Sequence, residues 1–271
     1  MPQAVDDWVL YSDHRAHFSA ALAASAKGSG GRLCILGAGK CNDCDLEQLL
    51  EVFSEIHLVD LEPAALAAAT ARQSPAVRAR LKPHAPVDLA GLPRKRLSKW
   101  QQKPPSREEL AAHQAATLSS ITSRLPGPFD VVASACVLTQ MAFALREALG
   151  ERHPRLAAIC GSIVATHLNS LLALTAVGGN CLFSSDLVSS SAYSALQSVT
   201  PETDLNALMN SIVDSGASYF AANPKLIRDI LSYDLRLAEH AGAPEQLAPW
   251  LWTGPLGRTY LVYALRFERI S

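Results

Sequence analysis

The sequence predicts an α/β fold: a mostly parallel, seven-stranded sheet with helices on both faces and a C-terminal antiparallel hairpin. Three observations lead to it. Short apolar runs typical of buried strands alternate with helical segments. A Gly-x-Gly turn separates the first strand from its helix, and the next strand closes on an acid. Near the C-terminus, two β-rich segments flank a Gly-Pro-Leu-Gly turn.

The elements follow in order along the chain. A leading helix over 6–26 ends at the glycine-rich break 27–31. Asp45 is a predicted N-cap, and Pro63 is placed at the first turn of a later helix. The expected strands are 33–36, 56–60, a segment within 77–87, 129–134, 180–184, 250–252 and 259–267.

Composition limits the function classes. The chain has 271 residues, a formal net charge of −1, 18% charged and 49% hydrophobic residues. It can bury a sizeable core, which excludes a disordered chain. Near-neutral charge argues against broad nucleic-acid binding. Because the strands run through the chain without a second nucleus, we expect one domain.

The sequence favours a cytoplasmic protein with no membrane span. The first seven residues are acidic where a signal peptide is basic. Residues 156–185 carry no Asp, Glu, Lys or Arg, but polar residues and the Gly178–Gly179 pair interrupt them. We therefore interpret this stretch as a buried helix, a turn and a central strand.

The six cysteines are scattered, and none is expected in a disulfide framework. Cys41 and Cys44 form a C-x-x-C without the second pair that zinc needs, so we expect reduced thiols and no metal.

Two segments stand apart from the strand–helix pattern. Residues 93–107 are strongly basic and contain Pro104–Pro105, which indicates a solvated loop or lid, with a nucleic-acid arm as the alternative. Residues 200–231 contain two helical stretches, with Pro201 and Pro224 at their starts.

The turn after the first strand carries the predicted chemistry. Gly37 and Gly39 let the backbone turn sharply and approach a ligand. Asp60 closes the next strand and should emerge beside that turn, placed to accept hydrogen bonds from ribose hydroxyls. A Walker pattern is absent, and Asn42 stands where a dinucleotide fingerprint has its third glycine.

These residues resemble a known family. Residues 34–41 (CILGAGKC) and 57–63 (HLVDLEP) are similar to motifs I and II of class I S-adenosylmethionine-dependent methyltransferases. The resemblance implies a Rossmann-like fold and S-adenosyl-L-methionine as the cofactor. It implies that the loop holds the methionine part and the second-strand acid the ribose. The residues assigned to the cofactor on this basis are Gly37, Ala38, Gly39, Asp60, Leu61 and Cys41, the last standing where the family often has a third glycine.

Further matches follow in the family's order. The segment 84–89 resembles the one after strand three, which assigns Asp88 and Leu89 to the adenine side. Residues 129–138 resemble motif IV, which places Ser134, Ala135 and Cys136 at the methyl-donor site. Residues 177–183 resemble the Gly-Gly turn into strand five. The motif that serves nucleobase-amine methylation in this family is absent after strand four.

Two residues are candidate catalytic groups. Asp186 follows strand five at the ligand-binding edge and is either a base or a cap. His167 either faces the site or is a buried core histidine. In the leading helix, Tyr11, His14 and Arg15 are candidates for ligand contact, with Tyr11 assigned to the cofactor. Met209, Tyr219 and Phe220 are candidate pocket walls or core.

The predicted function is methyl transfer from S-adenosyl-L-methionine to a small organic acceptor at O, N or C. Alternatives are a non-catalytic S-adenosylmethionine- or partner-binding protein, an aminopropyltransferase or an NAD-dependent oxidoreductase. We expect a helical cap over 1–30 and a methyltransferase domain over 31–271. Within that domain, 93–125 is a basic loop-and-helix insertion and 187–245 a helical acceptor-pocket insertion. The oligomeric state is left open.

Overall fold

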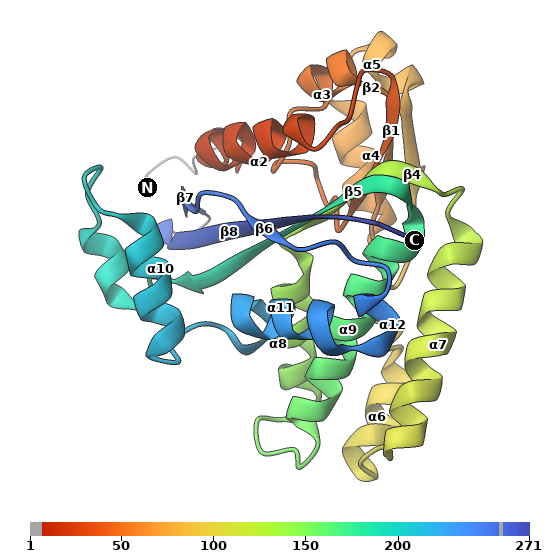
Figure 1. Cartoon of the computed structure of the whole chain (residues 1–271), viewed down its shortest axis with the longest axis vertical. Coiled ribbons are helices and arrows are strands. Elements are labelled where there is room, and N and C mark those ends of the chain that lie inside the picture. The colour runs from red at the N-terminus through yellow and green to blue at the C-terminus, as the bar shows by residue number, and fades with distance from the viewer. Residues whose placement is uncertain (1–6, 255–256) are drawn as a thin grey trace.

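The computed structural model describes residues 7–254 and 257–271 and contains one eight-stranded sheet (Figure 1). The strand order is β3-β2-β1-β4-β5-β8-β6, with β7 also paired to β8. Strands β1 to β5 run parallel to one another, and β8 is antiparallel to β5. The prediction of a mostly parallel, Rossmann-like sheet with an antiparallel C-terminal pair is confirmed. The sheet has eight strands and not the predicted seven, because the two-residue strand β6, Glu245–Gln246, also pairs with β8.

The strands are β1 Gly31–Leu36, β2 Phe53–Val59, β3 Leu81–His84, β4 Phe129–Ala135, β5 Thr175–Ser189, β6 Glu245–Gln246, β7 Trp250–Thr253 and β8 Thr259–Glu268. The α-helices are α1 Asp7–Leu10, α2 Ser12–Ala24, α3 Leu46–Val52, α4 Pro63–Ala71, α5 Pro75–Ala79, α6 Arg94–Gln102, α7 Arg107–Arg124, α8 Val137–Leu149, α9 Leu156–Leu174, α10 Leu205–Asp214, α11 Pro224–Tyr233 and α12 Leu235–Ala238. Two short 3-10 helices are Ser194–Ser198 and Phe220–Ala222.

Each face of the sheet packs against its own helices. Alternate β1 side chains face opposite sides, so Leu33 and Ile35 join one apolar cluster while Cys34 and Leu36 join the other. The first cluster includes side chains of α2, α3 and α4, and the second includes those of α7 to α11 (Figure 1). The two layers hold both sheet faces away from water, as a parallel sheet requires.

The short strands β6 and β7 continue one edge strand. Gln246 pairs with Leu265 of β8, and Trp250 pairs with Val262 further along the same side. The predicted C-terminal hairpin is therefore confirmed. Pro255 and Leu256 of its turn lie outside the described residues.

The buried segment 156–189 differs in detail from its prediction. The helix α9 ends at Leu174, and β5 starts at once, so Gly178 and Gly179 lie inside the strand and not between helix and strand. A Cβ on Gly179 would lie 2.7 Å from the Asp130 carbonyl oxygen, which explains the glycine. Helix α9 is the one candidate span in the described chain, but 67% of its apolar window is buried among protein, as in a core helix.

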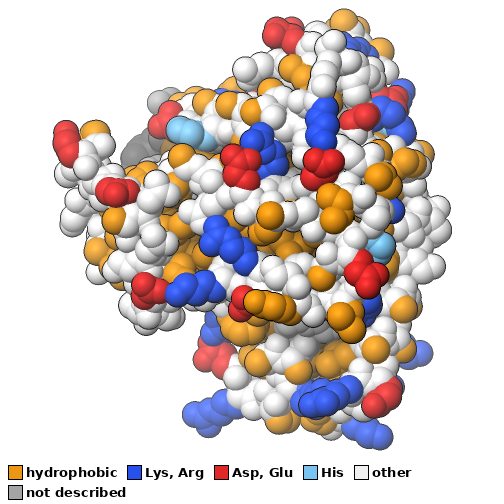
Figure 2. Space-filling model, viewed as in Figure 1, with side chains coloured by type: hydrophobic (Ala, Val, Ile, Leu, Met, Phe, Trp, Pro, Cys, Tyr) orange, Lys and Arg blue, Asp and Glu red, His pale blue; other side chains and the backbone are white. Residues whose placement is uncertain are grey.

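Three helix predictions need correction. The basic segment 93–107 contains the helix α6 instead of a loop, because Leu97 and Trp100 pack inward one turn apart. Helix α6 lies at the end of the molecule where Lys and Arg gather on the face shown in Figure 2 (compare Figure 1). Helix α10 begins at Leu205 with Asp204 as its N-cap, not at Pro201. The leading helix is interrupted at Tyr11.

Candidate functional site

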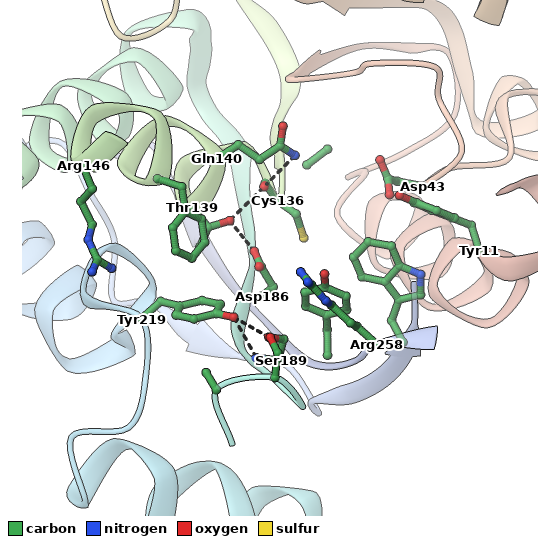
Figure 3. A pocket seen from close by; sticks show the side chains of 16 residues that line it. Tyr11, Asp43, Cys136, Thr139, Gln140, Arg146, Asp186, Ser189, Tyr219 and Arg258 are labelled. Carbon is green, nitrogen blue, oxygen red and sulfur yellow. Dashed lines mark hydrogen bonds between the residues drawn. The ribbon is translucent and has the colours of Figure 1, made fainter. Parts of the chain in front are cut away.

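Two adjoining pockets open at the carboxyl ends of the parallel strands. Ligands bind at this edge in open α/β sheets, where the strand order reverses between β1 and β4. The first pocket, about 540 Å³, surrounds the Gly37–Gly39 turn, and we call it the loop pocket. The second, about 610 Å³, is lined by Asp186, and we call it the Asp186 pocket (Figure 3). They share Tyr11, Asp43 and Gln140.

Positive φ angles shape the turn of the loop pocket. Gly37 has φ +77°, and a Cβ there would lie 2.4 Å from Val137 Cβ. Gly39 has φ +50°, and a Cβ would meet nothing within 4 Å, so its backbone faces open space in the pocket. Cys41 has φ +52°, the left-handed conformation that glycine adopts most readily. Cys41 thus keeps the turn that a third glycine would favour.

The Asp60 carboxylate links the turn to the end of β2. It accepts hydrogen bonds from the Gly39 N–H at 2.7 Å and the Glu62 N–H at 2.9 Å. A carboxylate has about four acceptor positions, so two are free for a ligand in the loop pocket.

Two arginines fix the segment after the turn. The Arg15 guanidinium donates to the Asn42 carbonyl oxygen at 3.2 Å. The Arg72 guanidinium donates to the Asn42 side-chain oxygen at 2.9 Å and to the Lys40 carbonyl oxygen. Both cations lie over the Trp8 ring of the leading helix. Asn42 therefore holds the loop through its side chain, which glycine would lack.

A buried chain of polar groups holds Asp43 at the junction of the pockets. Trp250 Nε1 donates to His14 Nδ1 at 2.9 Å, and His14 Nε2 lies 3.2 Å from Asp43 Oδ1. Because Nδ1 accepts, the proton of neutral His14 is on Nε2 and points at Asp43. His14 and Arg15 thus support the loop instead of lining a pocket.

Apolar and acidic groups line the loop pocket together. The Leu61 side chain, which is 53% exposed, and the buried Leu89 both line the pocket. Asp88 accepts from the Ala90 and Gly91 N–H groups, which fixes its carboxylate. The lining contains one cation, Lys40, and five acids: Asp7, Asp43, Asp60, Glu62 and Asp88. The loop pocket is therefore suited to a ligand with an apolar ring and positive charge.

Asp186 lies at the base of the second pocket. It lies inside β5 and not after the strand as predicted, because β5 continues to Ser189. The pairing with β8 shifts register between Asp186 and Val188, an irregularity of the kind that redirects side chains near active sites. Thr139 Oγ1 of α8 donates to Asp186 Oδ1 at 2.5 Å. Asp186 is only 8% exposed, and burial raises the pKa of its carboxyl group to about 6. It can therefore accept a proton near neutral pH.

The floor and one wall of the Asp186 pocket are fixed by hydrogen bonds. Cys136, which follows β4, has φ +48°, and its N–H donates to the Ser184 carbonyl oxygen at 3.2 Å. Burial and the nearby Asp186 charge raise the pKa of the Cys136 thiol, which keeps it protonated. Tyr219 accepts from the Ser189 N–H and lies 2.7 Å from the Ser189 hydroxyl. Hydrogen bonds therefore hold Cys136 on one side of Asp186 and Tyr219 with Ser189 on the other (Figure 3).

Most predicted ligand residues line one of the two pockets. Gly37, Gly39, Asp60, Leu61, Asp88 and Leu89 line the loop pocket, Ala135, Cys136, Asp186 and Tyr219 line the Asp186 pocket, and Tyr11 lines both.

Other predicted residues lie elsewhere. His167 is fully buried 2.7 Å from the Ser134 hydroxyl, and burial lowers its pKa to about 4. Its catalytic prediction needs correction, because a ring enclosed in the core cannot touch a substrate. Ser134, Ala38 and Cys41 are likewise buried and line neither pocket, so their side chains pack in the core beneath the site. Met209 is core, and Phe220 is exposed outside both pockets.

Sequence reasoning missed two groups of pocket residues. Thr139, Phe143 and Arg146 share one face of α8, and their spacing of three to four residues was the available signal. Trp252, Arg258 and Tyr260 come from the C-terminal hairpin, whose contact with the site no local pattern predicts.

The C-x-x-C thiols pack beside this site. Cys41 and Cys44 are both free and buried, and a hydrogen bond between them, with burial, raises the pKa of Cys44. Within the described residues, no group of His, Cys, Asp and Glu is arranged to hold a metal ion.

Comparisons with known proteins give only a structural similarity. No protein-family model and no curated protein matches the sequence. The N-methyltransferase NodS from Bradyrhizobium japonicum WM9 has 13% identity and a TM-score of 0.48, with 98% of this chain and 100% of that chain covered. The magnesium protoporphyrin IX methyltransferase ChlM from Synechocystis PCC 6803, with bound SAH, has 13% identity and a TM-score of 0.49, with 97% and 85% covered. The activity therefore has to be argued from the residues of this chain.

Proposed function

We propose that this protein is an S-adenosyl-L-methionine-dependent methyltransferase with a small organic acceptor. The loop pocket would hold the cofactor. Gly39 leaves room for close approach, Asp60 has two free acceptor positions for ribose hydroxyls, and Leu61 offers an apolar surface to a base. These features fit an adenosine group.

The charge of the loop pocket carries the proposal. S-adenosylmethionine has a sulfonium and an ammonium group against one carboxylate, so its net charge is positive. Five acids and one lysine favour such a ligand and repel the phosphates of NAD or ATP. The N-terminus of α3, where a phosphate would bind, is already capped by the Asp45 carboxylate, which accepts from the Gln48 N–H at 3.1 Å.

The Asp186 pocket would hold the acceptor. When bound, S-adenosylmethionine supplies a methyl group activated for direct displacement, so the chain has to orient the acceptor and receive a proton. Asp186, held by Thr139, is the proposed base. Ser189, Ser191, Ala192 and Tyr219 line the pocket from residues 187–245, which supports this segment as the acceptor-covering part of the domain. Arg146 and Arg258 disfavour the polyamine of an aminopropyltransferase.

The proposal includes a cytoplasmic location. All six cysteines are free and buried, as suits a reducing compartment.

Isothermal titration calorimetry tests the cofactor assignment. We expect S-adenosylmethionine and S-adenosylhomocysteine to bind with one site per chain, and NAD not to bind. Absence of binding by both sulfur ligands would overturn the proposal. Binding without methyl release to any acceptor in a metabolite panel would instead favour the non-catalytic alternative.

A further inference from the structure

The Asp186 pocket is unusually aromatic. Five of its sixteen lining residues are aromatic, whereas only 6% of all residues in the chain are. These five are Tyr11, Phe143, Tyr219, Trp252 and Tyr260. Phe143 is 42% exposed, although its ring packs edge-on against Tyr219. Tyr11 and Tyr260 lie on the Trp252 ring, with centroids 4.6 and 4.8 Å away. Such walls favour a flat aromatic ligand.

An arginine that pairs with no carboxylate of residues 7–254 and 257–271 lines the same pocket. Arg258 extends from the turn before β8 toward the pocket centre in Figure 3. Within the described residues it forms no ion pair, whereas the other pocket arginine, Arg146, is bonded to Glu151 at 2.6 Å. Asp43, the second acid of the pocket, is held by His14. Arg258 is therefore available to an anionic group of a ligand.

The remaining polar feature is the Asp186 carboxylate, on the sheet side of the pocket. It accepts a hydrogen bond from Thr139 and one from backbone N–H, and because a carboxylate has about four acceptor positions it retains acceptor capacity toward the pocket. A carboxylate so placed recognises a hydroxyl group and receives its proton. Burial keeps its pKa above that of an ordinary carboxyl group, which suits a base acting on a weak acid.

We propose that the acceptor is a hydroxylated aromatic acid, with its ring between the aromatic walls, its carboxylate on Arg258 and its hydroxyl group on Asp186. This inference rests on the proposed methyltransferase function and names its substrate class. In the reaction, the bond from methyl carbon to sulfur breaks and a bond to the hydroxyl oxygen forms. The hydroxyl proton passes to Asp186. The products are an aryl methyl ether and the thioether S-adenosylhomocysteine.

Calorimetry in saturating S-adenosylhomocysteine tests the acceptor class. The probes are para-hydroxybenzoate, para-coumarate, caffeate and a hydroxyquinoline carboxylate, each beside its methyl ester. We expect at least one acid to bind at least about tenfold more tightly than its ester, because the ester loses the charged hydrogen bond to Arg258. If S-adenosylhomocysteine binds and no acid binds better than its ester, the acceptor class is wrong while the cofactor assignment stands. If S-adenosylhomocysteine itself fails to bind, the proposed function fails first.

Variants locate the binding. Arg258→Gln should remove the preference for acid over ester and leave S-adenosylhomocysteine affinity unchanged. Arg124→Gln, at an exposed arginine of α7, is the matched control and should change neither. Phe143→Leu should weaken every aromatic probe, ester included. A preference for acids that survives in Arg258→Gln would overturn the assignment of Arg258.

Mass spectrometry of the reaction product identifies the acceptor atom. We expect an alkali-stable methyl ether from the best-binding acid. An alkali-labile methyl ester would contradict the placement of the hydroxyl group on Asp186.

Discussion

The Asp60 carboxylate has two roles in this site: it holds the turn through Gly39 and presents free acceptor positions to the loop pocket. We expect Asp60→Ala to weaken S-adenosylhomocysteine binding by about 1.5–3 kcal/mol, the range for a charged hydrogen bond, or roughly 10- to 150-fold in Kd. Calorimetry measures it, with Glu51→Ala, an exposed acid of α3, as control. Affinity within twofold of the wild type would show that the ribose is held elsewhere.

We expect the buried Asp186 carboxyl group to lower the stability of the protein, although methyl transfer needs it. Its pKa is raised from 3.8 to about 6 on folding, so the ionised form destabilises the folded protein above pH 6. This destabilisation fades as the pH falls from about 6 toward 4. We expect Asp186→Asn to raise the free energy of unfolding by about 1–3 kcal/mol at pH 8, and by less at pH 4.5. Urea unfolding at the two pH values measures it, with the exposed Asp229→Asn as control.

The same group should set the pH dependence of methyl transfer. The rate should fall as the pH is lowered through about 6, and Asp186→Asn should reduce it by about 10²–10⁴, the range for a general base. Thr139→Val should move the fall to higher pH, because the Thr139 hydroxyl lowers this pKa. If the rate falls at the same pH in Thr139→Val as in the wild type, the assignment of Asp186 as the base is wrong. The titratable or charged groups coupled to Asp186 across the site are His14, Asp43, Cys136, Tyr219 and Tyr263.

At the scale of elements, the turn after β1 packs against α8, and this close packing requires a glycine at position 37. We expect Gly37→Ala to destabilise the fold by several kcal/mol and to abolish S-adenosylhomocysteine binding, because its Cβ would overlap Val137 and its φ is positive. Gly161→Ala, inside α9 with open space around it, should stabilise by about 0.5–1 kcal/mol. Thermal unfolding of the Gly37→Ala and Gly161→Ala variants, each beside the wild type, measures the change in stability.

A second substitution separates the two causes of the destabilisation, the overlap with Val137 and the positive φ of Gly37. The double variant Gly37→Ala with Val137→Ala should regain part of the stability and retain the strain from the positive φ. A Gly37→Ala protein as stable as the wild type would contradict the described turn.

Some elements were predictable and others were not, for physical reasons. The turn at Gly37–Gly39 and the helix start at Pro224 have strong local signals, and the structure has both where predicted. Helix α6 was missed because its inward face consists of only Leu97 and Trp100 among charged residues. The boundary between α9 and β5 was misplaced because both are buried, so no change of polarity marks Leu174.

At the scale of the whole molecule, sheet order unites residues far apart in the sequence. Asp60 and Cys136 directly follow β2 and β4, Asp186 lies near the end of β5, and all three reach one sheet edge. The loop pocket was therefore largely predictable from motif order. The Asp186 pocket was not, since its aromatic walls and Arg258 come from the leading helix, α8 and the C-terminal hairpin, and only tertiary packing brings them together.

The low net charge of −1 conceals a separation of charge between the two pockets. The loop pocket is acidic, whereas the Asp186 pocket adds two arginines to its two acids. This pattern fits a cationic methyl donor beside an anionic acceptor, and opposite charges across the junction favour joint binding.

A crystal structure with S-adenosylhomocysteine tests the two-pocket arrangement most directly. We predict the nucleoside in the loop pocket, with its ribose hydroxyls on Asp60 and its base beside Leu61 and Asp88. The sulfur should lie at the junction formed by Tyr11, Asp43 and Gln140, facing the Asp186 pocket. A nucleoside bound anywhere else, or a sulfur atom facing away from Asp186, would contradict the proposed methyl transfer.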